Sequence, residues 1–255
     1  MIAILSPAKK LDFKKKVPTS QSTEILFSDE ASSLADDLKK FSPDELMNLM
    51  KISRQLGELN AERFIQWSWP FNSTKARQAI YAFNGEAYNG LDAWSLNHKE
   101  IETAQKQLRI LSGMYGVLRP LDNILPYRLE MGTKLKNEKG KDLYEFWGEK
   151  LTRQINEDLK QGKHKALINL ASQEYFKALD EDKIEKPVIT PVFKENKNGT
   201  YKVISIYAKK ARGMMVRFIV QNKLTQPEDL KAFDEDGYHF NNDLSKGNEM
   251  VFTRH

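Results

Sequence analysis

The chain has no cysteine among its 255 residues. This absence excludes disulfides, thiolate metal ligands and redox-active thiols, and it suits a reducing cytoplasm, where we expect the protein to reside. No apolar run approaches the roughly 20 residues that a membrane span needs. The first apolar run is short and is followed by lysines, so we expect neither a signal peptide nor a membrane partner.

Sequence motifs for metal and cofactor binding are also missing. The four histidines are scattered, with no pair three or four residues apart. Asp234, Asp236 and His239 are better explained as a solvated acidic loop than as an ion site. A P-loop, a dinucleotide fingerprint and a G-x-S-x-G motif are absent as well. We therefore expect no resident metal or cofactor.

Charge, by contrast, is abundant and unevenly distributed around a net value of +5. Residues 1–16 carry five lysines and one acid, and residues 209–223 carry five cations and no acid. Residues 228–249 carry seven acids and two lysines. The two basic segments suggest a polyanionic partner, although chance clustering on a solvated surface also explains such runs.

Apolar patterning predicts alternating helices and strands. Strands are predicted at 1–6, at 165–172 and in a hairpin at 188–208 that turns at Asn198 and Gly199. Helices are predicted at 29–40, 42–53, 99–112 and 142–160, and "ARQAIYAF" predicts a helix that turns into a strand. Pro191 has no N–H for a central ladder, so its strand should be an edge or bulged. We predict a single α/β domain, bordering on α+β, in which helices flank a mixed twisted sheet.

The clearest local signal is a helix start at Ser42. Ser42 is a good N-cap, Pro43 suits the first helical position, and Glu45 completes a capping box. A second short helix should follow a turn at Gly57. This pattern, at about residues 42–68, resembles a helix-hairpin-helix insertion, in which backbone N–H groups bind DNA phosphates without reading bases.

Three cations flank the predicted turn of this insertion: Lys51, Arg54 and Arg63. They are candidate phosphate contacts. Leu59 stands where a second glycine is usual, which puts close backbone approach to phosphate in doubt. An ordinary α-hairpin that packs its apolar face fits the same spacing.

A second candidate site combines two segments rich in polar aromatics and cations. In "LSGMYGVLRPLDNILPYRLEMG", arginines and tyrosines between turn formers can bind phosphate or carboxylate, but Arg119 and Arg128 can equally pair with Asp122 and Glu130. In "IYAKKARG", cations at a strand-to-helix junction suit a bound anion. The candidate pocket residues are Ser6, Tyr115, Arg119, Tyr127, Arg128, Lys209, Lys210 and Arg212.

Topology predicts that these two segments meet. Ser6 and Lys209 each directly follow a predicted strand, and open α/β sheets bind ligands at the carboxyl ends of strands. We therefore predict that Lys209, Lys210 and Arg212 lie with Ser6 beside Arg119 or Arg128 at one rim of the sheet.

Five motifs together resemble the bacterial YaaA family of peroxide-stress proteins: "SPAKKLDF", "LSGMYGVLRPLDNILPYRLEMG", "KDLYEFWG", "INLASQEYF" and "YAKKARGMMVRFI". The resemblance runs from Met1 to about Phe252. Lys10 departs from the expected small polar residue and adds charge without breaking the motif. The resemblance implies a cytoplasmic protein, made under hydrogen peroxide stress, that limits unincorporated iron and oxidative DNA damage. It also implies DNA binding through a helix-hairpin-helix element, here residues 42–68.

Two hypotheses about function follow. In the first, the protein is not an enzyme and binds double-stranded DNA independently of sequence, through Lys51, Arg54 and Arg63, with Lys9, Lys10 and Lys14 extending the patch. In the second, it is an enzyme or binding protein for a phosphorylated or nucleotide-like small molecule held in the tyrosine, arginine and lysine pocket. The sequence does not identify a reaction.

Overall fold

The computed structural model describes residues 1–72 and 74–255, and an eight-stranded sheet forms its centre. The strand order is β11-β12-β9-β8-β1-β5-β6, with β10 paired to β9. The strands are β1 (Ile2–Leu5), β5 (Leu108–Ser112), β6 (Gly116–Leu118), β8 (Leu167–Leu170), β9 (Val188–Lys197), β10 (Thr200–Lys202), β11 (His239–Phe240) and β12 (Glu249–Arg254). The run from β12 to β5 is parallel, and β6, β10 and β11 are antiparallel.

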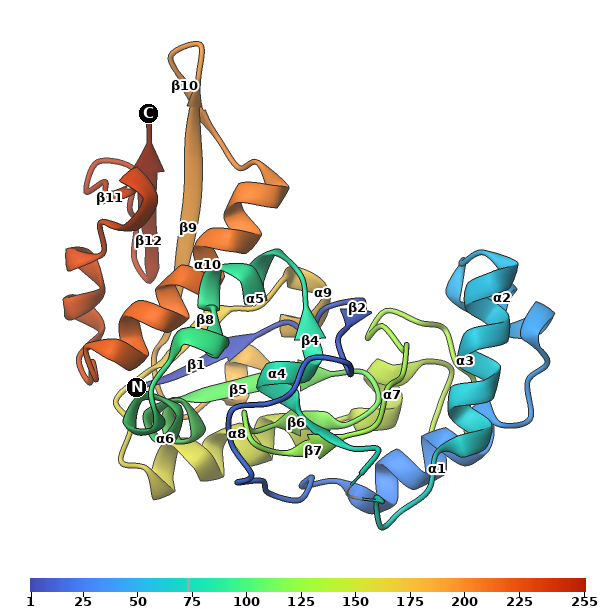
Figure 1. Cartoon of the computed structure of the whole chain (residues 1–255). Coiled ribbons are helices and arrows are strands. Elements are labelled where there is room, and N and C mark those ends of the chain that lie inside the picture. Colours follow the sequence, from blue (N-terminus) through green and yellow to red (C-terminus); the bar gives the residue numbers. More distant parts are fainter. Residues whose placement is uncertain (73) are drawn as a thin grey trace.

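Two small antiparallel ribbons and ten α-helices accompany this sheet within the described residues (Figure 1). The ribbons pair β2 (Lys10–Leu11) with β4 (Phe83–Asn84), and β3 (Arg77–Gln78) with β7 (Asn123–Ile124). The helices are α1 (Ser28–Leu38), α2 (Pro43–Met50), α3 (Arg54–Gln66), α4 (Ala79–Ala82), α5 (Glu86–Leu91), α6 (His98–Gln107), α7 (Leu143–Trp147), α8 (Lys150–Gln161), α9 (Gln173–Phe176) and α10 (Ser205–Gln221). Figure 1 shows α2 and α3 at one end of the molecule, away from the hairpin of β9 and β10. The α/β class with a mixed sheet is confirmed.

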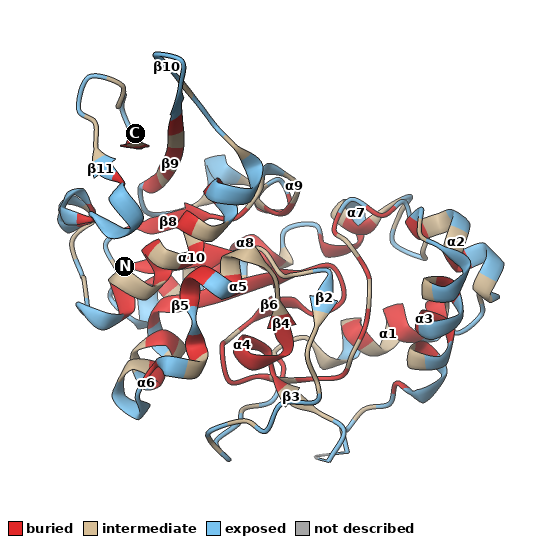
Figure 2. Ribbon diagram, turned by 45° about the horizontal axis from the view of Figure 1, so that its top comes forward, coloured by how far each residue is buried: buried red, intermediate tan, exposed pale blue. Residues whose placement is uncertain are grey.

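The core follows the parallel part of the sheet. Every residue of β1, β5 and β8 is buried, and Figure 2 shows β5 and β8 in red. Strands covered on both faces read as continuous apolar runs, and "IAIL" and "LINL" have this pattern. Among the described residues, no helix has both the length and the apolar content for crossing a membrane.

Several local predictions are confirmed. The side chain of Ser42 accepts the backbone N–H of Glu45 at 3.3 Å, and the Glu45 carboxylate accepts the backbone N–H of Ser42 at 2.8 Å. Asn198 and Gly199 turn the β9–β10 hairpin with φ of 54° and 79°. The prediction for Pro191 holds only locally: β9 lies between β12 and β8 and is not an edge strand, but Pro191 lies beyond the last pair that joins β9 to β8. The helix α4 runs directly into β4, as "ARQAIYAF" predicts.

Three predictions are wrong in part. The helix expected at 99–112 ends at Gln107, and its last five residues form the buried strand β5. The helix expected at 142–160 is two helices, because Gly148 adopts φ +48° between them. Gly57 lies inside α3 instead of in a turn, and its N–H donates to the carbonyl of Ser53 at 2.9 Å. The turn between α2 and α3 is at Lys51, which adopts φ 53°.

Candidate functional site

Two serines mark the carboxyl ends of neighbouring parallel strands. Leu5 of β1 pairs with Leu170 of β8, and Ser6 and Ser172 follow these strands. The backbone N–H of Ser172 donates to Ser6 Oγ at 2.8 Å, and Ser6 Oγ donates to Ser172 Oγ at 3.3 Å. This is the position at which open α/β sheets bind ligands.

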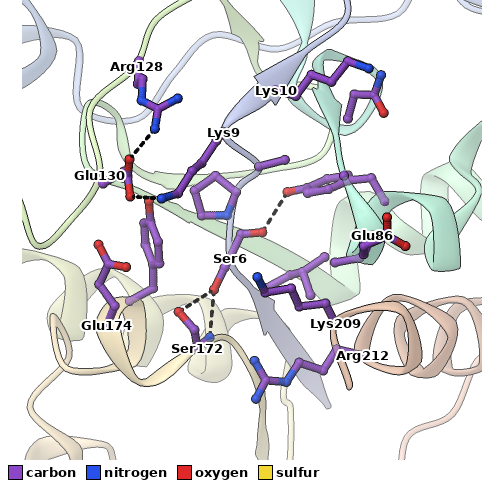
Figure 3. A pocket seen from close by; sticks show the side chains of 18 of the residues that line it. Ser6, Lys9, Lys10, Glu86, Arg128, Glu130, Ser172, Glu174, Lys209 and Arg212 are labelled. Atoms are coloured by element: carbon purple, nitrogen blue, oxygen red, sulfur yellow. Dashed lines mark hydrogen bonds and ion pairs between the residues drawn. The ribbon is translucent and has the colours of Figure 1, made fainter. Parts of the chain in front are cut away.

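A cavity of about 420 Å³ opens at these serines (Figure 3). Its wall comes from the segment after β1, from α5, from the segment before α7, from α9 and from α10. The charged residues that line it are Lys9, Lys10, Glu86, Arg128, Glu130, Glu174, Lys209 and Arg212. The volume falls in the usual range of small-molecule sites, about 300–1,000 Å³.

The helix α10 supplies two cations to this cavity, Lys209 and Arg212, which are three residues apart and so share a face. Neither makes an ion pair or side-chain hydrogen bond within residues 1–72 and 74–255. Burial lowers the pKa of the Arg212 guanidinium. The predicted strand-to-helix junction is wrong by one turn, because β10 ends at Lys202 and α10 begins at Ser205. The two cations therefore act from a helix side and not from a helix end.

Glycines bring α5 and α10 close enough to form one wall of the cavity. A Cβ on Gly213 would lie 1.7 Å from the carbonyl oxygen of Ala87, and one on Gly90 would lie 2.0 Å from that of Lys210. Only residues without a side chain permit this approach. The crossing places Glu86 of α5 in the same cavity as the cations of α10.

The opposite side of the cavity is a compact ion-pair cluster (Figure 3). Glu130 pairs with Lys9 at 2.6 Å and with Arg128 at 3.0 Å, so both of its oxygens are used. The Nε atom of Arg128 is buried and has no hydrogen-bond partner among the described residues. On the neighbouring α9, Glu174 accepts the backbone N–H of Gly132 at 2.9 Å.

Three buried tyrosines complete the wall: Tyr88, Tyr127 and Tyr175. The hydroxyl of Tyr88 donates to the carbonyl of Ser6 at 3.1 Å, and that of Tyr127 lies 2.7 Å from Ser112 Oγ. Burial raises the pKa of each hydroxyl, so all three rings stay neutral at physiological pH. They offer a ligand neutral aromatic surface.

The structure separates the predicted pocket residues into two groups. Ser6, Tyr127, Arg128, Lys209 and Arg212 line the cavity. Ser6 does so from a strand end, as the topological argument predicts, whereas Lys209 and Arg212 do so from the side of α10. The other three, Tyr115, Arg119 and Lys210, do not line it.

Each of these three residues has a structural partner. The hydroxyl of Tyr115 accepts the indole N–H of Trp67 at 3.0 Å and bonds the backbone of Leu125. Arg119 pairs with the fully buried Asp122 at 2.8 Å, which is the structural alternative stated for it above. Lys210 pairs with Asp236 at 3.2 Å.

The predicted DNA contacts are also divided. Lys9 and Lys10 line the cavity. Lys51 is exposed at the α2–α3 turn, and Arg54 pairs with Glu58 at 3.2 Å. Arg63 is half-buried, which lowers its pKa.

Gly57 does not present a free backbone donor at this hairpin. Its N–H is used inside α3, and a Cβ there would lie 2.5 Å from the carbonyl oxygen of Pro43. The glycine therefore permits two helices to cross.

Lys14 is the last of the predicted DNA contacts. It donates its backbone N–H to Asp12 at 2.8 Å.

Sequence reasoning missed Ser172, Glu86 and Glu174 as cavity residues. Ser172 follows a predicted strand as Ser6 does, so the rule about strand ends could have found it. Nothing in the sequence singles out Glu86 or Glu174.

Within the described parts of the chain, no three histidine, aspartate or glutamate side chains are grouped to hold a metal ion.

Comparison with known proteins identifies the family. A family model described as "Peroxide stress protein YaaA" matches residues 1–244. A UPF0246 protein of Hahella chejuensis is 54% identical over 254 residues, covering 100% of this chain and 99% of the relative. Similar UPF0246 proteins occur in Idiomarina loihiensis, 54% identical with 100% and 98% covered, and in Teredinibacter turnerae, 50% identical with 100% and 99% covered. The chain belongs to the YaaA family of peroxide stress proteins.

Proposed function

We propose that this peroxide stress protein binds a phosphorylated, nucleotide-like small molecule in the cavity at the ends of β1 and β8. The observation that carries the proposal is the pair Lys209 and Arg212, two cations at one cavity wall that no described acid neutralises. Lys209 is exposed and Arg212 is partly buried, and like charges on one helix face repel. A bound anion would offset this cost.

The form of the cavity favours phosphate as the anion. A guanidinium matches two phosphate oxygens at once, and a lysine beside it adds a point charge. The hydroxyls of Ser6 and Ser172 add polar groups to the same cavity. The tyrosine walls suit a ring. Phosphate and ring together describe a nucleotide-like ligand.

The double variant Lys209→Met, Arg212→Met tests this proposal. A hydrogen bond to a charged group contributes about 1.5–3 kcal/mol, so loss of both cations should weaken binding of adenosine 5′-monophosphate about 100-fold or more. Thermal stability should stay the same or rise, because the cations lose their mutual repulsion. Calorimetric titration and a thermal melt measure the two quantities.

The matched control is Lys202→Met, which removes an exposed lysine of β10 outside the cavity and should change neither quantity. Unchanged nucleotide affinity in the double variant would overturn the proposal. A double variant that unfolds would assign the two cations a structural role. Cells that carry the folded double variant should also lose protection against hydrogen peroxide.

A second candidate function is sequence-independent binding of double-stranded DNA in the cytoplasm. It is favoured by the start of α3, which has no acid in its first turn and is flanked by Lys51 and Arg54. The first turns of α1 and α2 each contain two acids, whereas those of α8 and α10, like that of α3, contain none. A long helix that begins without acids can receive a phosphate. DNA covered in this way would be less accessible to oxidative damage. As part of this second candidate function, the protein would also limit unincorporated iron, as the resemblance to the family implies.

Salt dependence tests this second candidate. Duplex affinity should fall linearly with salt concentration on logarithmic axes, because bound cations release counterions. In Lys51→Ala, Arg54→Ala the slope should decrease by about 1 for each phosphate that the variant no longer binds. The control Lys197→Ala removes a lysine at the end of β9 and should leave the slope unchanged. A duplex affinity that does not respond to salt would exclude this mode of binding.

A further inference from the structure

The cavity contains carboxylates as well as cations, and they are not equivalent. Glu130 uses both oxygens on Lys9 and Arg128. Glu174 has no cation partner within the described residues, and its one side-chain hydrogen bond uses Oε1 alone. Glu86 likewise has neither an ion pair nor a side-chain hydrogen bond there. An ionised carboxylate accepts hydrogen bonds and donates none, so these oxygens require donors.

These free carboxylates are unsuited to a plain polyanion. A ligand such as pyrophosphate would place negative charge in a small cavity that already has two unneutralised carboxylates. Figure 3 shows Glu174 and the cations of α10 coming from different sides of Ser6. Glu86 lies on the same side as these cations, so the cavity has a cationic side that includes Glu86 and another side on which Glu174 is the free hydrogen-bond acceptor. A ligand that satisfies both is anionic at one end and carries donors at the other.

We infer that the occupant is a phosphorylated sugar or nucleoside, with its phosphate on Lys209 and Arg212 and its hydroxyl or amine donors on Glu174. This inference depends on the proposed small-molecule function and specifies its ligand class. Carboxylates bind ribose hydroxyls in nucleotide sites for the same chemical reason, since the carboxylate accepts two donors. The neutral rings of Tyr88 and Tyr175 provide surface for the sugar or base between the two ends.

The simpler explanation is that Glu174 only anchors the loop at Gly132. Glu174→Gln separates the two roles. An amide oxygen still accepts the Gly132 N–H, so the loop keeps its hydrogen bond, while the charge and half of the acceptor capacity for a ligand are lost. The control Glu138→Gln removes one negative charge from a residue outside the cavity.

Three probes measured by calorimetric titration decide between these roles: adenosine 5′-monophosphate, ribose 5-phosphate and inorganic pyrophosphate. In Glu174→Gln we expect the affinity for adenosine 5′-monophosphate to fall roughly tenfold or more, and the affinity for pyrophosphate to stay the same or rise. A loss of affinity for both sugar-containing probes would show that sugar hydroxyls donate to Glu174. A loss of affinity for adenosine 5′-monophosphate alone would show that the amine of the base donates to it. In Glu138→Gln all three affinities should match the wild type.

Failure of the inference can be told apart from failure of the proposed function. If the wild-type protein binds none of the probes, both are wrong. If it binds them through Lys209 and Arg212 but Glu174→Gln leaves adenosine 5′-monophosphate unaffected, or weakens all three probes equally, the cavity binds phosphate and the inference about the second end is wrong. A preference of the wild type for pyrophosphate over both sugar phosphates would also overturn it.

Discussion

Gly213→Ala should destabilise the protein by about 3 kcal/mol or more, although alanine is normally the better helix former. The added Cβ would lie 1.7 Å from the carbonyl oxygen of Ala87, which belongs to a backbone that cannot rotate away. Forcing extra volume into such a contact typically costs about 1–3 kcal/mol, and occasionally more. In an exposed helix interior the same change would stabilise by roughly 0.5–1 kcal/mol. The sign of the change in stability therefore shows whether the contact with Ala87 or the helix propensity of alanine dominates.

A thermal melt measures this effect, with an expected fall in Tm of roughly 6–12 °C for a chain of this size. Gln221→Ala, at the exposed end of the same helix, is the control and should change Tm little. The separation of α5 from α10 should also move Arg212 relative to Ser6 and weaken nucleotide binding. A variant as stable as the wild type would show that the two helices are held apart by other contacts.

Arg254→Met should be the other strongly destabilising change. Arg254 pairs with Glu195 at 2.9 Å and with Asp236 at 2.7 Å, and its guanidinium lies 4.7 Å from the ring centre of Tyr238. The side chain of Glu195 is only 12% exposed. Removing one partner of a buried ion pair leaves an uncompensated charge and costs about 3–5 kcal/mol. The expected fall in Tm is roughly 6–20 °C.

The double variant Arg254→Met, Glu195→Gln provides the control. It removes the unpaired charge while an amide oxygen still accepts the hydroxyl of Tyr238. Its stability should recover much of the loss, because the cost comes chiefly from the isolated carboxylate and not from the missing attraction. If the double variant melts at the same temperature as Arg254→Met, the arginine stabilises β12 by packing instead.

Local signals in the sequence predicted local structure well. The helix start at Ser42 and the turn at Asn198 each depend on a few adjacent residues, and both are confirmed. The boundary between α6 and β5 could not be found in this way. Leu108 and Leu111 continue the helical spacing of Ile101, but they are drawn into a strand because β1 supplies a parallel partner about one hundred residues away.

Two glycines were misread, for different reasons. Gly57 was predicted to be a turn, yet it is helical and permits α3 to cross α2. Gly148 was passed over inside a helical pattern, yet it separates α7 from α8. The role of Gly57 cannot be read from spacing, since the atom it approaches belongs to α2. The role of Gly148 is local, because it ends α7 with a positive φ, and a glycine at a helix end is a signal that the helical pattern concealed.

The cavity was predictable where one rule about strand ends applied. That rule correctly placed Ser6 at the rim, but it reached Lys209 and Arg212 through a strand end that does not exist there, since both lie on the side of α10. It could not place Glu86, whose position depends on the close crossing of α5 and α10. The rule also could not show that Arg119 forms an ion pair with Asp122, because the burial of Asp122 depends on the tertiary structure.

The hydrogen bond between Ser6 and Ser172 joins residues 166 positions apart. Interactions of such long separation require closure of a large loop, and they slow folding because chain entropy decreases before the bond can form. The intervening chain includes β5, which must also pair with β1. The cavity beside these serines is therefore formed late in folding, and a newly made chain lacks it until its central sheet is assembled.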